Sequence, residues 1–144
     1  MAPELKNHTV TAFDQDLKKI TASLYDMNLL VTDSMRLFKQ SISNQAAEYI
    51  VNVRDIDDKI NELEKQVEKL STNIIALRHP MAVDLRFVIS AIKVSTMVER
   101  QGDIIEKAVR KIPGINPKLL PLYQPQLDEI ANIIIEMLTH AIKG

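Results

Sequence analysis

The sequence has no cysteine, no tryptophan and only three glycines in 144 residues. The absence of cysteine excludes disulfide bonds and thiolate metal sites, and it fits a cytoplasmic protein. So few glycines indicate long regular elements, and no glycine-rich loop is present to cradle a phosphate. Aromatic residues make up 4% of the chain, so a platform that stacks nucleic-acid bases is not expected.

An excess of charge and a long apolar run are missing as well. The formal net charge is -1, so no overall field would recruit nucleic acid or an anionic membrane. No apolar run approaches the roughly 20 residues of a membrane-spanning helix, and the N-terminal MAPELKNHTV lacks the apolar segment of a signal peptide. These absences, together with 46% hydrophobic residues, lead us to expect a soluble cytoplasmic protein with one modest core and no nucleic-acid partner.

Apolar residues recur every three or four positions along three long stretches, which is typical of amphipathic helices. The cap-type residues SISNQ (41–45) separate the first stretch from the second, and Arg78-His79-Pro80 separates the second from the third. In the third stretch Gly102 occupies one of the apolar positions. The predicted inner stripes are Val10, Phe13, Leu17, Ile20, Leu24, Met27, Val31, Phe38 and Ile42, then Val53, Ile56, Ile60, Leu63, Val67, Leu70, Ile74 and Leu77, then Phe87, Ala91, Val94, Val98, Ile105, Val109 and Ile112.

These stretches predict an all-α fold. Three helices of about 30 residues, each roughly 45 Å long and joined by short turns, form an up-down-up antiparallel bundle over residues 1–112. The prolines of IPGINPKLLPLYQP predict a proline-rich linker over 113–126, followed by the beginning of a fourth helix over 127–144. This helix has an apolar stripe that must be buried. It can fold back on the bundle, pair with another chain or belong to a longer fold, and we favour the last two.

The stretch VERQGD (98–103) places two acids four residues apart on the third helix. Because an α-helix turns 100 degrees per residue, Glu99 and Asp103 share a flank with apolar neighbours rather than with the other charged residues. If the second and third helices run antiparallel from the turn at His79, Asp57 stands level with residue 101, between the two acids. Three or four oxygen ligands could then converge, as a cation such as Mg, Mn or Fe requires.

A plainer interpretation explains the same residues. Long exposed helices are rich in acids, and Asp103 has basic neighbours in Arg100 and Lys107. Glu99 and Asp103 can therefore simply belong to a solvent-exposed face of the helix. Glu99 is harder to explain in this way, because the residues four positions before and after it are Ser95 and Asp103, and neither is basic. Spacing alone leaves both interpretations open.

Motifs for catalysis are missing from the sequence. The three histidines, His8, His79 and His140, share no metal-binding spacing and are expected to be structural or incidental. No serine lies in a nucleophile elbow, and no acid and base pair with substrate contacts is recognisable. An enzyme is therefore not expected.

Two motifs carry a resemblance to a known family. The run RHPMAVDLR (78–86), followed by VERQGD (98–103), resembles the signature of the PhoU family of phosphate-transport regulators. Asp57, Asn61 and Glu64 also fit that family's pattern in the second helix. The resemblance extends from about residue 8 to residue 112. It implies a PhoU-like three-helix bundle, and it makes residues 127–144 the first helix of an incomplete second PhoU-like repeat.

The resemblance also implies a function for the acids. PhoU-like proteins bind metal ions through an acid, three residues and then an aspartate, so Glu99 and Asp103 are expected as metal ligands and Asp57 as the supporting acid of the second helix. An iron or zinc cluster is the expected cofactor, with Mg or Mn as further candidates. His79 replaces the family's usual glutamine, but it stands roughly 30 Å from the acids along a helix and is not expected to be a ligand.

For the whole chain, the resemblance implies negative regulation of phosphate uptake and of phosphate-regulon signalling. PhoU-like proteins are adaptors between the ATPase subunit of the phosphate ABC transporter and a sensor histidine kinase, and we expect a homodimer. The alternative is a structural helical module that binds no metal and serves interaction or dimerisation through its fourth helix.

Overall fold

The computed structural model describes residues 2–143, with side chains from residue 11 to residue 143. Within this range the regular elements are α1 (Ala2–Ser43), α2 (Glu48–Arg78), α3 (Ala82–Lys111) and α4 (Leu120–Lys143), with a short 3-10 helix, η1 (Ile112–Gly114), before α4. The predicted all-α class is confirmed. None of the described helices is long and apolar enough to cross a membrane.

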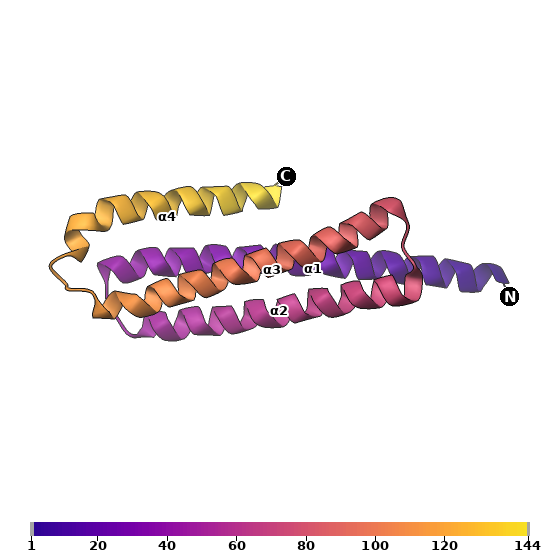
Figure 1. The fold of residues 1–144 in the computed structure, drawn as a ribbon, viewed down its shortest axis with the longest axis horizontal. Helices are drawn as coiled ribbons and strands as arrows, with labels where there is room; N and C mark the ends of the chain where they lie inside the picture. Colours follow the sequence, from indigo (N-terminus) through magenta and orange to yellow (C-terminus); the bar gives the residue numbers. More distant parts are fainter. Residues whose placement is uncertain (1, 144) are drawn as a thin grey trace.

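Helices α1, α2 and α3 form the up-down-up bundle expected from the sequence, and each contacts the other two (Figure 1). The turn between α2 and α3 is short because His79 ends α2 in the left-handed conformation, with φ of 46°, and Pro80 follows it. Helix α3 therefore runs back along α2. This antiparallel arrangement brings the acids of the two helices together.

The core lies between the three helices. Its buried apolar positions on α2 recur every seven residues, which is typical of an antiparallel helical seam. These positions are Val53, Ile60, Val67 and Ile74. Leu77, which was predicted to continue this stripe, is 75% exposed, because it lies in the last turn of α2 at the end of the bundle.

The inner stripe of α3 differs from the prediction by one residue at two places. Phe87 and Val94 are 36% and 43% exposed, whereas the following residues, Val88 and Ser95, are buried. Ser95 can be buried because its hydroxyl donates a hydrogen bond to the carbonyl of Ile92 at 2.9 Å. A polar residue thus occupies an inner position while an apolar one faces outward, which the apolar pattern alone does not reveal.

Helix α4 begins at Leu120, inside the stretch that was predicted to be a linker. Pro121 falls in its first turn, where the missing N–H is not needed, and the first turns are bent relative to the rest of the helix, which contains Pro125 (Figure 1). Leu120 is buried with Ile42 and Ile112 in a small apolar cluster of its own. This burial explains why the helix starts earlier than the prolines suggest.

Helix α4 folds back along α1, on the side of α1 away from α2 (Figure 1). Ala131 and Leu138 are buried there, and Lys39 Nζ donates a hydrogen bond to Asn132 Oδ1 at 2.9 Å. Folding back, the arrangement that we did not favour from the sequence, is therefore what the structure shows for this face of α4. A second stripe of the helix stays exposed, and it consists of Ile130, Ile133 and Met137.

Candidate metal centre

The candidate site lies at the α2–α3 interface, where Gly102 faces α2. A Cβ atom at Gly102 would stand 2.9 Å from Ile60 Cδ1 and 3.4 Å from Asp57 Oδ1. The two helices can approach this closely only because the residue has no side chain. Asp57 therefore lies level with Gly102, between Glu99 and Asp103, as the antiparallel register predicts.

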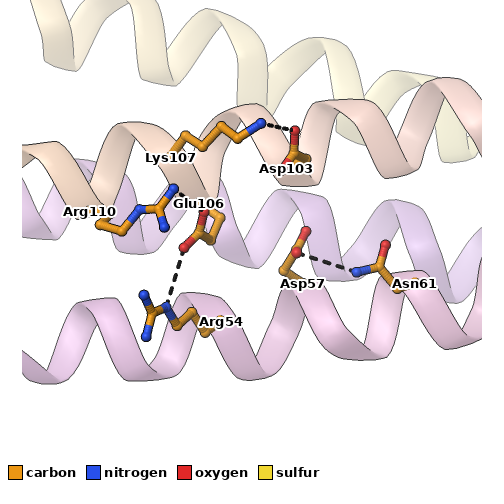
Figure 2. Close-up of polar contacts among 7 residues, drawn as sticks. All are labelled: Arg54, Asp57, Asn61, Asp103, Glu106, Lys107 and Arg110. Carbon is orange, nitrogen blue, oxygen red and sulfur yellow. Dashed lines mark hydrogen bonds and ion pairs between the residues drawn. The ribbon is translucent and has the colours of Figure 1, made fainter.

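Asp57 extends from α2 toward α3 (Figure 2). Its Oδ2 accepts a long hydrogen bond from Asn61 Nδ2 at 3.4 Å, whereas its Oδ1 is buried and has no hydrogen-bond partner. Burial is the largest factor that raises the pKa of Asp57, and the negative charges of Asp103, Glu106 and Asp58 add to it. Asp57 thus carries a negative charge that its surroundings do not compensate.

Glu99 lies half-buried on the same flank of α3 as Asp103. Burial raises the pKa of Glu99, and the charges of Glu64, Asp103 and Asp57 raise it further, while Lys107 opposes them. The carboxylates of the two helices therefore repel one another through a medium that screens them less well than bulk water does.

Asp103 is engaged by a neighbour on its own helix. Its Oδ2 accepts a hydrogen bond from Lys107 Nζ at 2.7 Å (Figure 2). In this conformation, no group of three histidine, aspartate or glutamate side chains among residues 11–143 is arranged to hold a metal ion. A cation that binds Asp57, Glu99 and Asp103 together has to compete with Lys107 for Asp103.

The residues nevertheless fit a cation in their chemistry. All the donors are carboxylate oxygens, which suit hard and borderline divalent cations. The buried Asp57 Oδ1 lacks a partner, and the raised pKa values of Asp57 and Glu99 reflect burial and mutual repulsion. A cation among these acids would offset the repulsion and satisfy that oxygen.

Sequence reasoning missed Glu106, which lies 7% exposed in the interface and is the only charged residue that is buried among the described side chains. Its Oε1 lies 3.5 Å from Arg54 Nε, and its Oε2 lies 3.6 Å from Arg110 (Figure 2). A signal was present in the sequence, because residue 106 follows Gly102 by four positions and so shares the face that meets α2.

The histidines do not join the acids. His79 is exposed at the turn after α2, 22 positions from Asp57, and His140 lies on α4, where it pairs with Glu136 at 3.7 Å. His8 falls outside the described side chains. The expectation that His79 is no ligand agrees with its position.

Comparisons with known proteins extend these observations. A family model described as the PhoU domain matches residues 24–112. The phosphate-specific transport system accessory protein PhoU homolog of Zymomonas mobilis is 29% identical over 135 residues, which cover 94% of this chain and 57% of that protein. The phosphate-specific transport system accessory protein PhoU of Edwardsiella tarda is 33% identical over 106 residues, which cover 74% of this chain and 44% of that protein. No solved structure matches the chain.

The chain thus spans about half the length of the curated relatives it matches. The matched segment contains both motifs that carry the resemblance and all the acids of the candidate site. The family consists of accessory proteins that are not enzymes, in line with the absence of catalytic motifs. From the match over residues 24–112, the chain belongs to the PhoU family.

Proposed function

We propose that this chain is a cytoplasmic, metal-binding adaptor that restrains phosphate uptake and phosphate-regulon signalling. The observation that carries the metal-binding part is the position of Asp57 between Glu99 and Asp103, with its Oδ1 buried and without a donor. The phosphate part rests on family membership and on relatives named as accessory proteins of the phosphate-specific transport system.

In this proposal Glu99 and Asp103 of α3 and Asp57 of α2 hold the cation. An iron or zinc cluster is the first candidate, and Mg or Mn the next. When bound, the metal supplies positive charge where the acids of α2 and α3 repel one another, and so ties the two helices together. The partners are the ATPase subunit of the phosphate ABC transporter and a sensor histidine kinase, the chain acts as a homodimer, and its contact with the membrane is indirect.

Metal content tests the site directly. The purified chain should retain Fe or Zn, measured by elemental analysis, after chelator treatment, reloading and desalting. The Glu99→Gln/Asp103→Asn variant should lose most of this metal while its helical circular dichroism is unchanged. Glu129→Gln/Glu136→Gln on α4 removes the same number of charges and should keep the metal. A Glu99/Asp103 variant that retains the wild-type metal content would exclude these ligands.

Regulation needs a separate test in cells. A phosphate-regulon reporter is measured in phosphate-rich medium, in a host that lacks its own PhoU-family protein. The wild-type chain should lower the reporter signal, and the Glu99→Gln/Asp103→Asn variant should not. Absence of repression by a wild-type chain that binds metal would overturn the regulatory part and leave the metal site standing.

The alternative is a structural interaction module that binds no metal. The exposed stripe of Ile130, Ile133 and Met137 on α4 favours it, because apolar residues on the outer face of a helix are typical of contact surfaces. This alternative predicts a chain that stays metal-free after incubation with Fe or Zn and that forms dimers all the same.

A further inference from the structure

Glu106 is buried in the α2–α3 interface, and both of its ion pairs are long. Its side chain is 9% exposed, and its two ion pairs, with Arg54 and Arg110, measure 3.5 Å and 3.6 Å (Figure 2). Both distances exceed the roughly 2.7–2.9 Å of a close charge-assisted hydrogen bond. The two arginine side chains are 57% and 48% exposed, so water competes for each of them. Two long ion pairs to exposed arginines hold a carboxylate less tightly than two close ones would.

The position of Glu106 relates it to the candidate metal centre. It lies one helical turn after Gly102, on the face of α3 that meets α2. The negative charge of Glu106 is among the causes that raise the pKa of Asp57, so the two carboxylates repel each other across the interface. In Figure 2 both side chains lie between the ribbons of α2 and α3.

We infer that Glu106 is a further carboxylate of the cation site, held by Arg54 and Arg110 until a cation displaces them. The inference rests on the metal binding proposed above, and it adds a ligand outside the pair Glu99 and Asp103. With Glu106, four carboxylates line the interface and offer enough oxygen donors for a six-coordinate ion. Arg54 and Arg110 need no new partner when they are displaced, because both already reach solvent.

A ligand role and a structural role for Glu106 predict opposite results at the arginines. If Glu106 only anchors them, loss of Glu106, Arg54 or Arg110 loosens the same interface, and each loss weakens cation binding. If Glu106 is a ligand, each arginine competes with the cation. Loss of an arginine then strengthens cation binding, while loss of Glu106 weakens it.

The experiment titrates the full chain, stripped with a chelator, with Mn²⁺ and separately with Zn²⁺. Glu106→Gln keeps the shape of the side chain and should weaken binding by about tenfold or more, a loss typical of groups around a metal. Arg54→Gln and Arg110→Gln should each tighten it severalfold. Glu62→Gln, which removes an exposed acid of α2 paired with Lys65, is the matched control and should leave the affinity unchanged.

Thermal unfolding gives a second measurement that does not depend on Glu106→Gln folding well. Without cation, Arg110→Gln should unfold at a lower temperature than wild type, because Glu106 loses a partner. With saturating Mn²⁺ its unfolding temperature should rise by more than that of wild type.

Two results would overturn the inference while leaving the proposed site intact. One is a Glu106→Gln affinity within twofold of wild type. The other is weaker binding in the arginine variants, in parallel with Glu106→Gln. Failure of wild type to bind either ion would instead overturn the proposed metal binding, and this inference with it.

Discussion

Gly102 and Ile60 set how closely α2 and α3 approach at the level of the acids. A Cβ atom at position 102 would stand 2.9 Å from Ile60 Cδ1, and Ile60 is fully buried, so it has little room to move. Glycine at this helical position sacrifices about 1 kcal/mol of helix propensity relative to alanine. The close approach of the two helices offsets that loss.

The contact between Gly102 and Ile60 predicts that substitutions at the two positions are coupled. Gly102→Ala in the wild-type background should lower the free energy of unfolding, because overpacking of about 1–3 kcal/mol exceeds the gain in propensity. In the Ile60→Val background the Cδ1 atom is gone, so the same substitution should stabilise by about 0.5–1 kcal/mol. Urea unfolding of wild type, Gly102→Ala, Ile60→Val and the double variant measures the coupling. Effects that add within about 0.5 kcal/mol would show that the contact does not limit the approach.

The raised pKa of Asp57 predicts how stability depends on pH without a cation. Between the usual pKa of 3.8 and the raised one, the folded chain binds more protons at Asp57 than the unfolded chain does. The free energy of unfolding therefore falls as pH rises through this interval, and the full penalty is present above it. Asp57→Asn should be more stable than wild type at pH 7 after chelation, and the difference should shrink as pH falls toward 4.

Urea unfolding of both proteins across pH 4–8 checks this prediction. An Asp57→Asn variant that is less stable than wild type at neutral pH would contradict the assigned burial and repulsion.

The sequence predicts a residue of the site when helix geometry alone determines its position, and not when a tertiary contact does. The level of Asp57 followed from counting along two antiparallel helices from the turn at His79, and Asp57 does lie beside Gly102 of α3. Whether the three acids of the candidate site hold a metal stays a prediction. The ion pair of Glu106 with Arg54 could not be foreseen in the same way, because it is a tertiary contact between residues 52 positions apart on two helices.

At the scale of elements, the sequence predicted α1, α2 and α3 well, because each repeats an apolar stripe over many turns. Errors arose where apolar residues lie on two faces of one helix, as at Phe87 and Val94, which point partly to solvent. They also arose at α4, whose start depends on a tertiary contact of Leu120 with Ile42 and Ile112 rather than on local pattern. Proline content alone therefore overestimated the length of the linker.

The fold-back of α4 predicts opposite sensitivities at two adjacent residues. Leu138 is buried with the main core, whereas Met137 is 67% exposed. Leu138→Ala should lower the free energy of unfolding by about 2–4 kcal/mol, because it leaves a cavity in that core. Met137→Ala should stay within about 0.5 kcal/mol of wild type. Urea unfolding measures both, and equal effects would show that α4 is not docked on α1 through this face.

At the scale of the whole molecule, α1 lies at the centre of the packing, with α2 and α3 against one part of its surface and α4 against another (Figure 1). Between α3 and α4 a groove of about 280 Å³ stays open over α1. Val31 and Met35 of α1 line it, together with Ile104 of α3 and Met137 of α4. The outer stripes of α3 and α4 thus form one apolar surface beside this groove.

This surface predicts that the purified chain associates with itself. Met97 and Ile104 of α3 are 64% and 55% exposed, and Ile133 and Met137 of α4 are 50% and 67% exposed. Exposed apolar stripes of this kind are typical of contact surfaces, and among the described helices only α1 packs extensively against α4. The mass measured by light scattering should therefore rise from that of a monomer toward that of a dimer as the concentration increases.

Polar substitution on the outer stripe tests whether this surface causes the association. Ile133→Ser/Met137→Ser should keep the chain monomeric at concentrations where wild type is dimeric, because the apolar area that drives association is removed. Its helical circular dichroism should match wild type, since neither side chain is part of the buried core. Thr72→Ala/Asn73→Ala, at exposed polar positions on α2, is the control and should leave the mass unchanged. A wild-type chain that stays monomeric up to millimolar concentration would remove the support for assembly through α4.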